Sequence, residues 1–380
     1  MAGKAGRLIS VVFIVFVVFG NNASAQIRWD GEAGDGFWTN PQNWVGNQVP
    51  LAIDRVILDN SLVTGSYEVI IGPGAVQVMV SNVHLAPVAG ETISLVIPTD
   101  NTLAPALVCT GDGYGLILER GAIFRNASGA SAGAPFEVAD SIRINDGGQF
   151  IHNTARSHAS NVRALSRAPG TEKGEFEFRI PVASSTISVS GQVFGRLRLM
   201  PGLNNTINYT GTGTNDLTVR SDLEIGHGVN LNFNLQGELN IGGSLIQYGG
   251  ILNLGTTARL LNVRINGDLL QSAGAVLTET GQAVPVLRLA GNAMQTVDCK
   301  GSITNDVEIE FDNATGVSLA SDLTVNHLLR LQQGFIQTDL HVLTLEAGAM
   351  IELPGEGYVD GRIKKKGLTD GDFMFPVGKN

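Results

Sequence analysis

Three copies of one pattern recur in this chain at a constant interval of 24 residues. The copies are Gly243-Ser-Leu-Ile-Gln247, Gly267-Asp-Leu-Leu-Gln271 and Gly291-Asn-Ala-Met-Gln295, and an alternating apolar pair precedes each of them. A unit of this length cannot bury an apolar face alone, so it is stable only when neighbouring copies stack and share one core. The spacing therefore predicts a solenoid with regular rungs over residues 239–300.

Within each copy, apolar residues alternate with polar ones, as in Leu239-Asn-Ile241, and glycines separate the runs. This pattern indicates short strands joined by tight turns. We expect an all-β fold, a parallel β-solenoid of the right-handed β-helix type, in which Leu245 and Leu269 point inward and stack. Leucine-rich repeats have similar lengths, but their convex segments need connections unlike the Gly/Asn/Thr-rich ones here. A sandwich or a propeller is the other alternative.

The composition suits small, tight rungs. Glycine accounts for 48 of 380 residues, and only 16% of residues are charged, against about a quarter in typical domains. The formal net charge is −10, which argues against nucleic acid or an anionic membrane as the main partner.

The first 25 residues have the organisation of a secretory signal peptide. Lys4 and Arg7 precede an apolar run over residues 8–19, and Ala23-Ser-Ala25 is a small-x-small cleavage site. We expect cleavage after Ala25 and a secreted or cell-surface protein. No later segment approaches the 18 apolar residues of a membrane-spanning helix, so we expect no membrane insertion after the signal is removed.

All three tryptophans, Trp29, Trp38 and Trp44, fall within residues 26–60, which do not fit the repeat. The first rung of a solenoid exposes a sheet edge and an apolar cross-section, and bulky aromatic side chains can cover both. We interpret residues 26–60 as an N-terminal cap and residues 61–380 as the solenoid. A platform on which sugars stack is the alternative.

Residues 152–173 interrupt the strand pattern and are basic within an acidic chain. They contain Arg156, Arg163, Arg167 and Lys173 but a single acidic residue. Long loops on rigid scaffolds often carry function. We interpret the segment as a long loop across one face and its four cations as a binding surface for an acidic glycan or a cell-surface or matrix protein. A solvated insertion without a ligand is the alternative.

The order of these segments resembles the N-terminal region of large secreted surface proteins of Bacteroidota. The resemblance rests on the tryptophan segment, the Gly-x-x-x-Gln rungs, and the closing strings Gly357-Tyr-Val-Asp-Gly361 and Phe375-Pro-Val-Gly378. It covers nearly all of the mature chain. Such proteins usually end in a sorting domain of the type IX secretion system. No such domain precedes Asn380, and we expect this chain to lack it.

Enzymatic motifs are weak. Gly226-His227-Gly228 and Arg362-Ile363-Lys364 match strings of polygalacturonases, but the adjacent Asp-Asp pair that these hydrolases use is missing. No basic residue lies among regularly spaced aspartates, as a lyase would need. We therefore predict no catalytic residues, no metal and no cofactor, and a non-enzymatic scaffold, stalk or adhesin-like surface. The alternatives are a carbohydrate-active enzyme or binding module, and a matrix or filament subunit.

The two cysteines, Cys109 and Cys299, are 190 residues apart. That interval is about eight rungs, or roughly 38 Å at ~4.8 Å per strand, whereas bridged Cα atoms lie within about 7 Å. We expect no disulfide between them.

Overall fold

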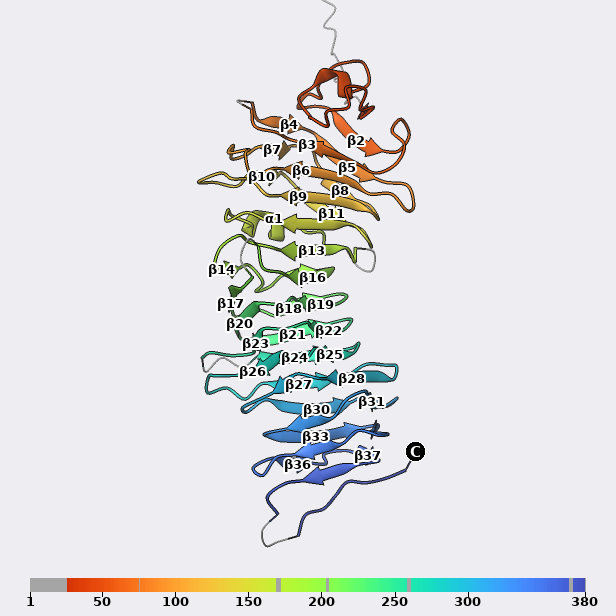
Figure 1. Ribbon diagram of the computed structural model, residues 1–380, viewed down its shortest axis with the longest axis vertical. Helices are drawn as coiled ribbons and strands as arrows, with labels where there is room; N and C mark the ends of the chain where they lie inside the picture. Colours follow the sequence, from red (N-terminus) through yellow and green to blue (C-terminus); the bar gives the residue numbers. More distant parts are fainter. Residues whose placement is uncertain are drawn as a thin grey trace, which may run out of the picture.

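The computed structural model describes residues 26–74, 76–168, 172–202, 205–257, 261–368 and 372–379. These residues form a parallel β-solenoid of about 13 turns, which confirms the predicted fold class (Figure 1). The turns stack along one axis, so the molecule is elongated. The predicted signal peptide, residues 1–25, lies outside the described residues.

A regular turn contributes one strand to each of three faces, in the order first face, long sheet, third face. The long sheet runs through all the turns without a break and holds 13 strands. These strands are β3 (Tyr67–Ile70), β6 (Ile93–Ile97), β9 (Ala122–Asn126), β12 (Gln149–His152), β13 (Glu175–Phe178), β16 (Arg196–Leu199), β19 (Leu223–Ile225), β22 (Leu245–Gln247), β25 (Leu269–Gln271), β28 (Gln295–Cys299), β31 (Val317–Leu319), β34 (Phe335–Gln337) and β37 (Tyr358–Asp360).

The first face consists of a five-stranded sheet followed by an eight-stranded sheet. The five strands are β1 (Gln26–Arg28), β2 (Arg55–Asp59), β5 (Asn82–Ala86), β8 (Tyr114–Leu118) and β11 (Ser141–Ile144). The eight strands are β15 (Val193–Phe194), β18 (Leu217–Val219), β21 (Gly237–Ile241), β24 (Leu261–Ile265), β27 (Val286–Leu289), β30 (Glu308–Asp312), β33 (Leu328–Gln333) and β36 (Met350–Glu352).

The third face is divided into sheets of three, six and three strands. They are β4 (Val78–Val80), β7 (Leu107–Cys109) and β10 (Phe136–Val138); then β14 (Ser184–Ile187), β17 (Ile207–Gly213), β20 (Val229–Leu235), β23 (Ile251–Asn253), β26 (Val276–Thr278) and β29 (Ser302–Ile303); and finally β32 (Leu323–Val325), β35 (Leu343–Leu345) and β38 (Ile363–Lys365).

The repeat sets the register of the central turns. Leu245 pairs with Leu269, and Ile241 pairs with Ile265, each 24 residues on. These side chains are buried, at 2% exposure or less, as the alternating pattern predicts. Gly267 lies directly on the preceding copy, where an added Cβ atom would approach the carbonyl carbon of Gly243 to 2.5 Å. The repeated glycine therefore permits the close stacking of successive corners.

The first two repeated glutamines, Gln247 and Gln271, end strands β22 and β25 of the long sheet. Gln271 donates from Nε2 to Oε1 of Gln247 at 3.0 Å, and Gln247 donates to the carbonyl of Val276 at 3.0 Å. Both side chains are buried, so the ladder gives their amide groups the hydrogen-bond partners that burial requires.

The third copy departs from the regular register. Gln271 pairs with Cys299, 28 residues on, whereas Gln295 pairs with Val317. The Gln295 amide donates instead to the carbonyl of Ile265, 3.1 Å away. A corner that is four residues longer thus shifts the strand, and the expectation of three rungs with identical registers is wrong for the last one.

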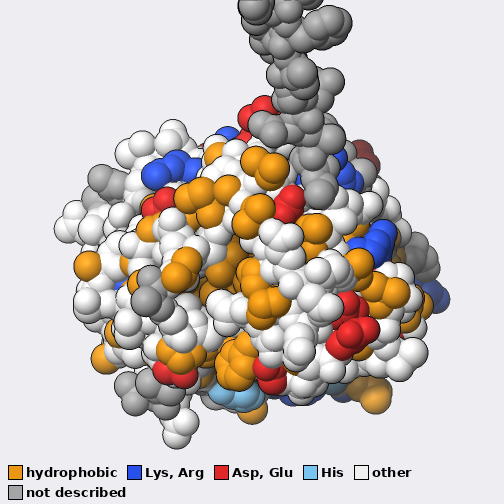
Figure 2. All heavy atoms as spheres, turned by 90° about the horizontal axis from the view of Figure 1, so that it is seen from above, with side chains coloured by type: hydrophobic (Ala, Val, Ile, Leu, Met, Phe, Trp, Pro, Cys, Tyr) orange, Lys and Arg blue, Asp and Glu red, His pale blue; other side chains and the backbone are white. Residues whose placement is uncertain are grey.

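The N-terminal segment covers the first turns. Strand β1 extends the first face beside β2, and Phe37 forms a parallel bridge with Ile70 of β3. A short 3-10 helix, η1 (Pro41–Asn43), lies between Trp38 and Trp44. Viewed from this end, apolar side chains are visible between charged ones (Figure 2), and the segment contributes Val45, Leu51 and Ile53 to the exposed apolar surface.

The basic segment 152–173 completes one turn with almost no strand. Helix α1 (Ala159–Arg163) lies against β10, in the position of a strand of the third face. Leu165 then forms a parallel bridge with Ile142 of β11 on the first face. The segment therefore differs from the single loop that we expected, because a helix and one bridge replace two strands of a regular rung.

Cys109 and Cys299 are not joined by a disulfide, and both are buried. Cys109 is in β7 on the third face, and Cys299 is in β28 of the long sheet, several turns away. Burial raises the pKa of each thiol to about 12, which makes both sulfurs poor nucleophiles.

Candidate functional site

The four cations proposed from the sequence do not form one patch. Arg163 and Arg167 line one hollow, Lys173 lines another, and Arg156 binds the carbonyl of Ser131 through Nη1. Arg163, Arg167 and Lys173 are exposed, whereas Arg156 is half-buried. The binding surface predicted over the whole segment is therefore divided between separate places.

The first of these places, which we call the helix-side hollow, has a volume of about 660 Å³. The residues after α1 form one wall, and the start of β8 and the start of β11 form the other. Polar and aromatic groups line it: Tyr114, Asp140, Ser141, Arg163 and Arg167. Its size lies within the range of small-molecule sites.

The second place, the strand-end groove, has a volume of about 460 Å³ and follows the amino ends of β9, β12, β13 and β16. Most of its charges are already paired. Arg120 forms an ion pair with Asp146 at 2.5 Å, and Arg196 forms one with Asp222 at 2.8 Å. Lys173 also lines the groove. Paired charges leave this groove less attractive to an anion than its composition suggests.

An arginine and carboxylate ladder covers the outside of the long sheet. Arg198 on β16 lies between Glu177 on β13 and Glu224 on β19, at 3.5 Å from each. Burial raises the pKa of Glu177 and of Glu224, while Arg198 opposes the rise.

The two glutamates are two strands apart, roughly 9.6 Å, which is near the carboxylate separation of inverting glycosidases. Here, however, the intervening space holds the Arg198 guanidinium, and the Glu177 side chain has 0% exposure. A sugar would have no access to both carboxylates. The ladder therefore fits a structural role in the sheet.

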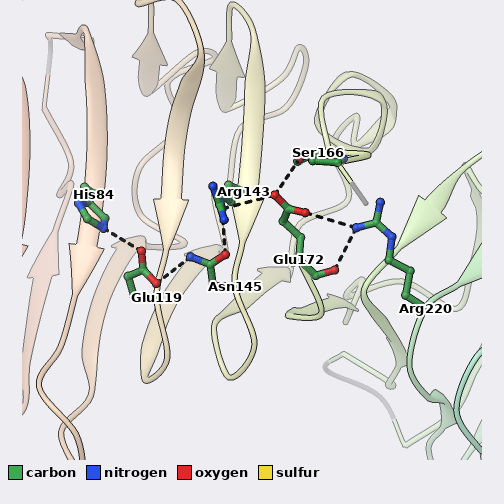
Figure 3. A network of polar contacts seen from close by, with 8 residues as sticks. His84, Glu119, Arg143, Asn145, Ser166, Glu172 and Arg220 are labelled. Atoms are coloured by element: carbon green, nitrogen blue, oxygen red, sulfur yellow. Dashed lines mark hydrogen bonds and ion pairs between the residues drawn. The ribbon is translucent and has the colours of Figure 1, made fainter. Parts of the chain in front are cut away.

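A further polar network crosses the first face where its two sheets meet (Figure 3). Glu172 is buried, with Arg143 of β11 at 3.4 Å and Arg220 beyond β18 at 3.6 Å. Arg220 also donates to the backbone carbonyl of Glu172 at 3.1 Å, and Ser166 donates to its carboxylate at 3.2 Å. Glu172 thus links the end of the basic segment to β11 on one side, through Arg143, and to the chain after β18 on the other, through Arg220.

Two histidines of the same segment lie inside the solenoid. His152 has 0% and His158 has 8% exposure, and their ring centroids are 5.2 Å apart. His152 Nε2 lies 3.1 Å from the carbonyl of Arg156, and His158 Nε2 accepts from the amide of Ser188 at 3.1 Å. Burial lowers the pKa of His152 to about 3 and that of His158 to about 4.

The three tryptophans are buried rather than displayed. Trp29 is 2% exposed, and Trp38 and Trp44 are 0% exposed. Trp44 packs edge-on against both others, at centroid distances of 4.9 and 4.7 Å, and donates from Nε1 to the Trp38 carbonyl at 2.7 Å. No indole face is available to a sugar, so this packing favours the cap interpretation over the stacking platform.

The polygalacturonase-like strings lie in different turns. His227 follows β19, whereas Arg362 follows β37, six strands further along the long sheet. That separation is roughly 29 Å, too far for both to contact one sugar. Within the described ranges, no three His, Cys, Asp or Glu side chains gather as metal ligands would.

The charge pattern of the sequence predicts Arg163 and Arg167 but not Tyr114, Asp140 and Ser141, which face them from the preceding turns. The missed residues are 22 or more positions away in the chain, and only the stacking of turns brings them together. None of the helices among the described residues is long and apolar enough to cross a membrane.

Comparisons of the chain with protein-family models, curated protein sequences and solved structures find no match. Inferences about function therefore depend on the geometry of this chain.

Proposed function

We propose that this chain is a non-enzymatic, exported β-solenoid scaffold, a stalk or adhesin-like element that presents an interaction surface along its side. The observation that carries the proposal is the continuous long sheet of 13 strands. Each turn shares one core with its neighbours, so the scaffold holds surface groups at fixed spacings along its length.

The state of the ionisable groups supports a scaffold over an enzyme. Catalytic carboxylates need access to substrate and to water. Here Glu177, Glu224 and Glu172 are enclosed by arginines from neighbouring turns. These ion pairs hold adjacent strands together on the outside, as the apolar residues do on the inside.

A product assay tests the proposal directly. The purified chain is incubated with a panel of neutral and acidic polysaccharides, and new reducing ends and unsaturated sugars are measured by mass spectrometry. We expect no product from any polysaccharide. Turnover that persists after rigorous purification, and that disappears in a variant of an exposed acidic residue, would establish a carbohydrate-active enzyme instead.

A further inference from the structure

The helix-side hollow combines two unpaired cations with a fixed carboxylate and an aromatic ring. Arg163 is the last residue of α1, and Arg167 lies in the segment that directly follows the helix. Among the described residues, no carboxylate forms an ion pair with either guanidinium. This contrasts with Arg120, Arg196 and Arg198, each of which is paired.

Arg167 is held in place although it is exposed. Its Nη2 donates to the carbonyl of Gly191 at 3.2 Å and lies 3.3 Å from Oε1 of Gln192. The guanidinium has five N–H donors in a planar fork, so donors remain for a ligand. An anchored guanidinium loses less conformational freedom on binding than a free one.

The opposite wall carries groups of another kind. Asp140 accepts from the amide of Gly113 at 2.8 Å and from Ser141 Oγ at 2.7 Å. The hydrogen bond from Ser141, followed by that from Gly113, lowers the pKa of Asp140, so the carboxylate is ionised near neutral pH. The ring of Tyr114 stands beside it, with the Arg143 guanidinium 5.2 Å from its centroid.

We propose that the helix-side hollow binds a uronic acid residue of an acidic polysaccharide, with Arg163 and Arg167 on the sugar carboxylate and Asp140 on a sugar hydroxyl group. The proposal rests on the scaffold function proposed above and specifies its ligand. Planar guanidinium groups match a carboxylate in two-point hydrogen bonds. A carboxylate such as Asp140 accepts from hydroxyl groups, which a uronic acid supplies next to its own negative charge.

The same wall argues against other anions. Asp140 repels a compact, multiply charged group such as phosphate, and an acidic peptide has few hydroxyl donors to offer it. Tyr114 supplies apolar surface for the C–H groups of a sugar ring. The combination therefore favours a hydroxylated, singly charged unit.

The test is a titration of the full chain with trigalacturonate, followed by calorimetry at 50 mM and 500 mM NaCl. Neutral galactotriose and an aspartate-rich peptide are titrated in parallel. We expect weak, saturable binding of trigalacturonate that falls at least tenfold at high salt, because the screening length of exposed charges shortens from about 14 Å at 50 mM to about 4 Å at 500 mM. Binding of galactotriose should be absent, and binding of the peptide should be weaker.

Three variants locate the site. Arg163→Ser/Arg167→Ser should reduce the affinity for trigalacturonate at least tenfold. Asp140→Asn should weaken the binding of trigalacturonate without weakening the binding of the peptide, because it removes a hydroxyl acceptor and a negative charge together. The matched control, Arg120→Ser/Lys173→Ser, removes two cations from the strand-end groove and should leave the affinity unchanged. Circular dichroism melting curves verify that each variant is folded.

The inference is overturned if trigalacturonate does not bind, if the peptide binds more tightly, or if the control variant loses as much affinity as the hollow variant. Cleavage of trigalacturonate during the titration would instead refute the scaffold function itself. The two failures are thus distinguishable.

Discussion

The buried histidine pair makes the stability of the solenoid depend on pH. His152 and His158 lie inside the turn formed by the basic segment, and burial lowers their pKa values to about 3 and about 4. In the unfolded chain both titrate near the ordinary value of about 6.5. Below pH 6.5 the unfolded state therefore binds more protons than the folded state, and stability falls as the pH falls toward the folded-state values.

The size of the effect follows from these values. At pH 5.0 each imidazole lies 1.5 units below the unfolded value, and one unit corresponds to about 1.4 kcal/mol. Each histidine thus removes about 2 kcal/mol of unfolding free energy between pH 7.5 and pH 5.0, or about 4 kcal/mol for the pair. Other groups also titrate in this range, so the comparison must be made between variants.

The double variant His152→Phe/His158→Phe tests this effect, because it keeps planar rings beside Phe178 and removes both titratable groups. Urea unfolding is followed at pH 7.5 and 5.0 by circular dichroism. Tryptophan fluorescence reports only the cap, because all three tryptophans lie before residue 45. Hydrogen exchange at Phe176 and Phe178 reports the turn around the histidines.

We expect the loss of stability between the two pH values to be about 4 kcal/mol smaller in the double variant than in the parent. The control His227→Phe changes an exposed histidine and should keep the parental dependence. Equal pH dependence in the parent and the double variant would show that the two histidines do not cause the loss of stability at low pH, whatever the absolute stability of the variant.

Other consequences concern the turns and their ends. Gly267→Ala forces a Cβ against Gly243 and should destabilise the central turns by about 1–3 kcal/mol, whereas Gly348→Ala, which meets nothing within 4 Å, should be close to neutral in urea unfolding. Glu172→Gln leaves two arginines without their shared carboxylate and should lower the free energy of unfolding by about 1–3 kcal/mol in urea. Unchanged stability would show that the network of Figure 3 does not stabilise the fold. Trp44→Ala empties the centre of the cap and should lower the free energy of unfolding by about 3–5 kcal/mol, so the fluorescence of the remaining indoles should change at a lower urea concentration. A midpoint equal to that of the parent would mean that the cap does not protect the first turns.

The central turns could be predicted from the sequence because equal spacing forces equal register. Leu245 and Leu269 are equivalent positions of one repeat, and no other arrangement buries both while keeping the corners identical. The shift at Gln295 could not be predicted, since an extra length of four residues in a corner leaves the local alternation of the strand intact. The Gly-x-x-x-Gln motif recurs a third time, but the length of the corner between β27 and β28 determines which residues of β25 and β28 pair.

The basic segment was the least predictable part. Helix α1 has only five residues, too few for a helical period to be visible. His152 is the last residue of β12 and is buried, although the sequence pattern placed it in the interruption, and its contact with His158 depends on the helix. Arg163 and Arg167 could be identified from their charge alone. Their partners in the hollow could not, because Tyr114 and Asp140 come from earlier turns.

One uninterrupted solenoid that acts as a rigid scaffold fixes the distance between two points along its axis. Glu68 on β3 and Ser318 on β31 lie in the same outward row of the long sheet, ten strands apart. Spin labels are attached there through bio-orthogonal amino acids, so that Cys109 and Cys299 stay in place, and the distance is measured by pulsed electron paramagnetic resonance. A rigid solenoid gives a single narrow distribution near ~48 Å, ten spacings of about 4.8 Å. A broad distribution, or one centred far below this value, would contradict it.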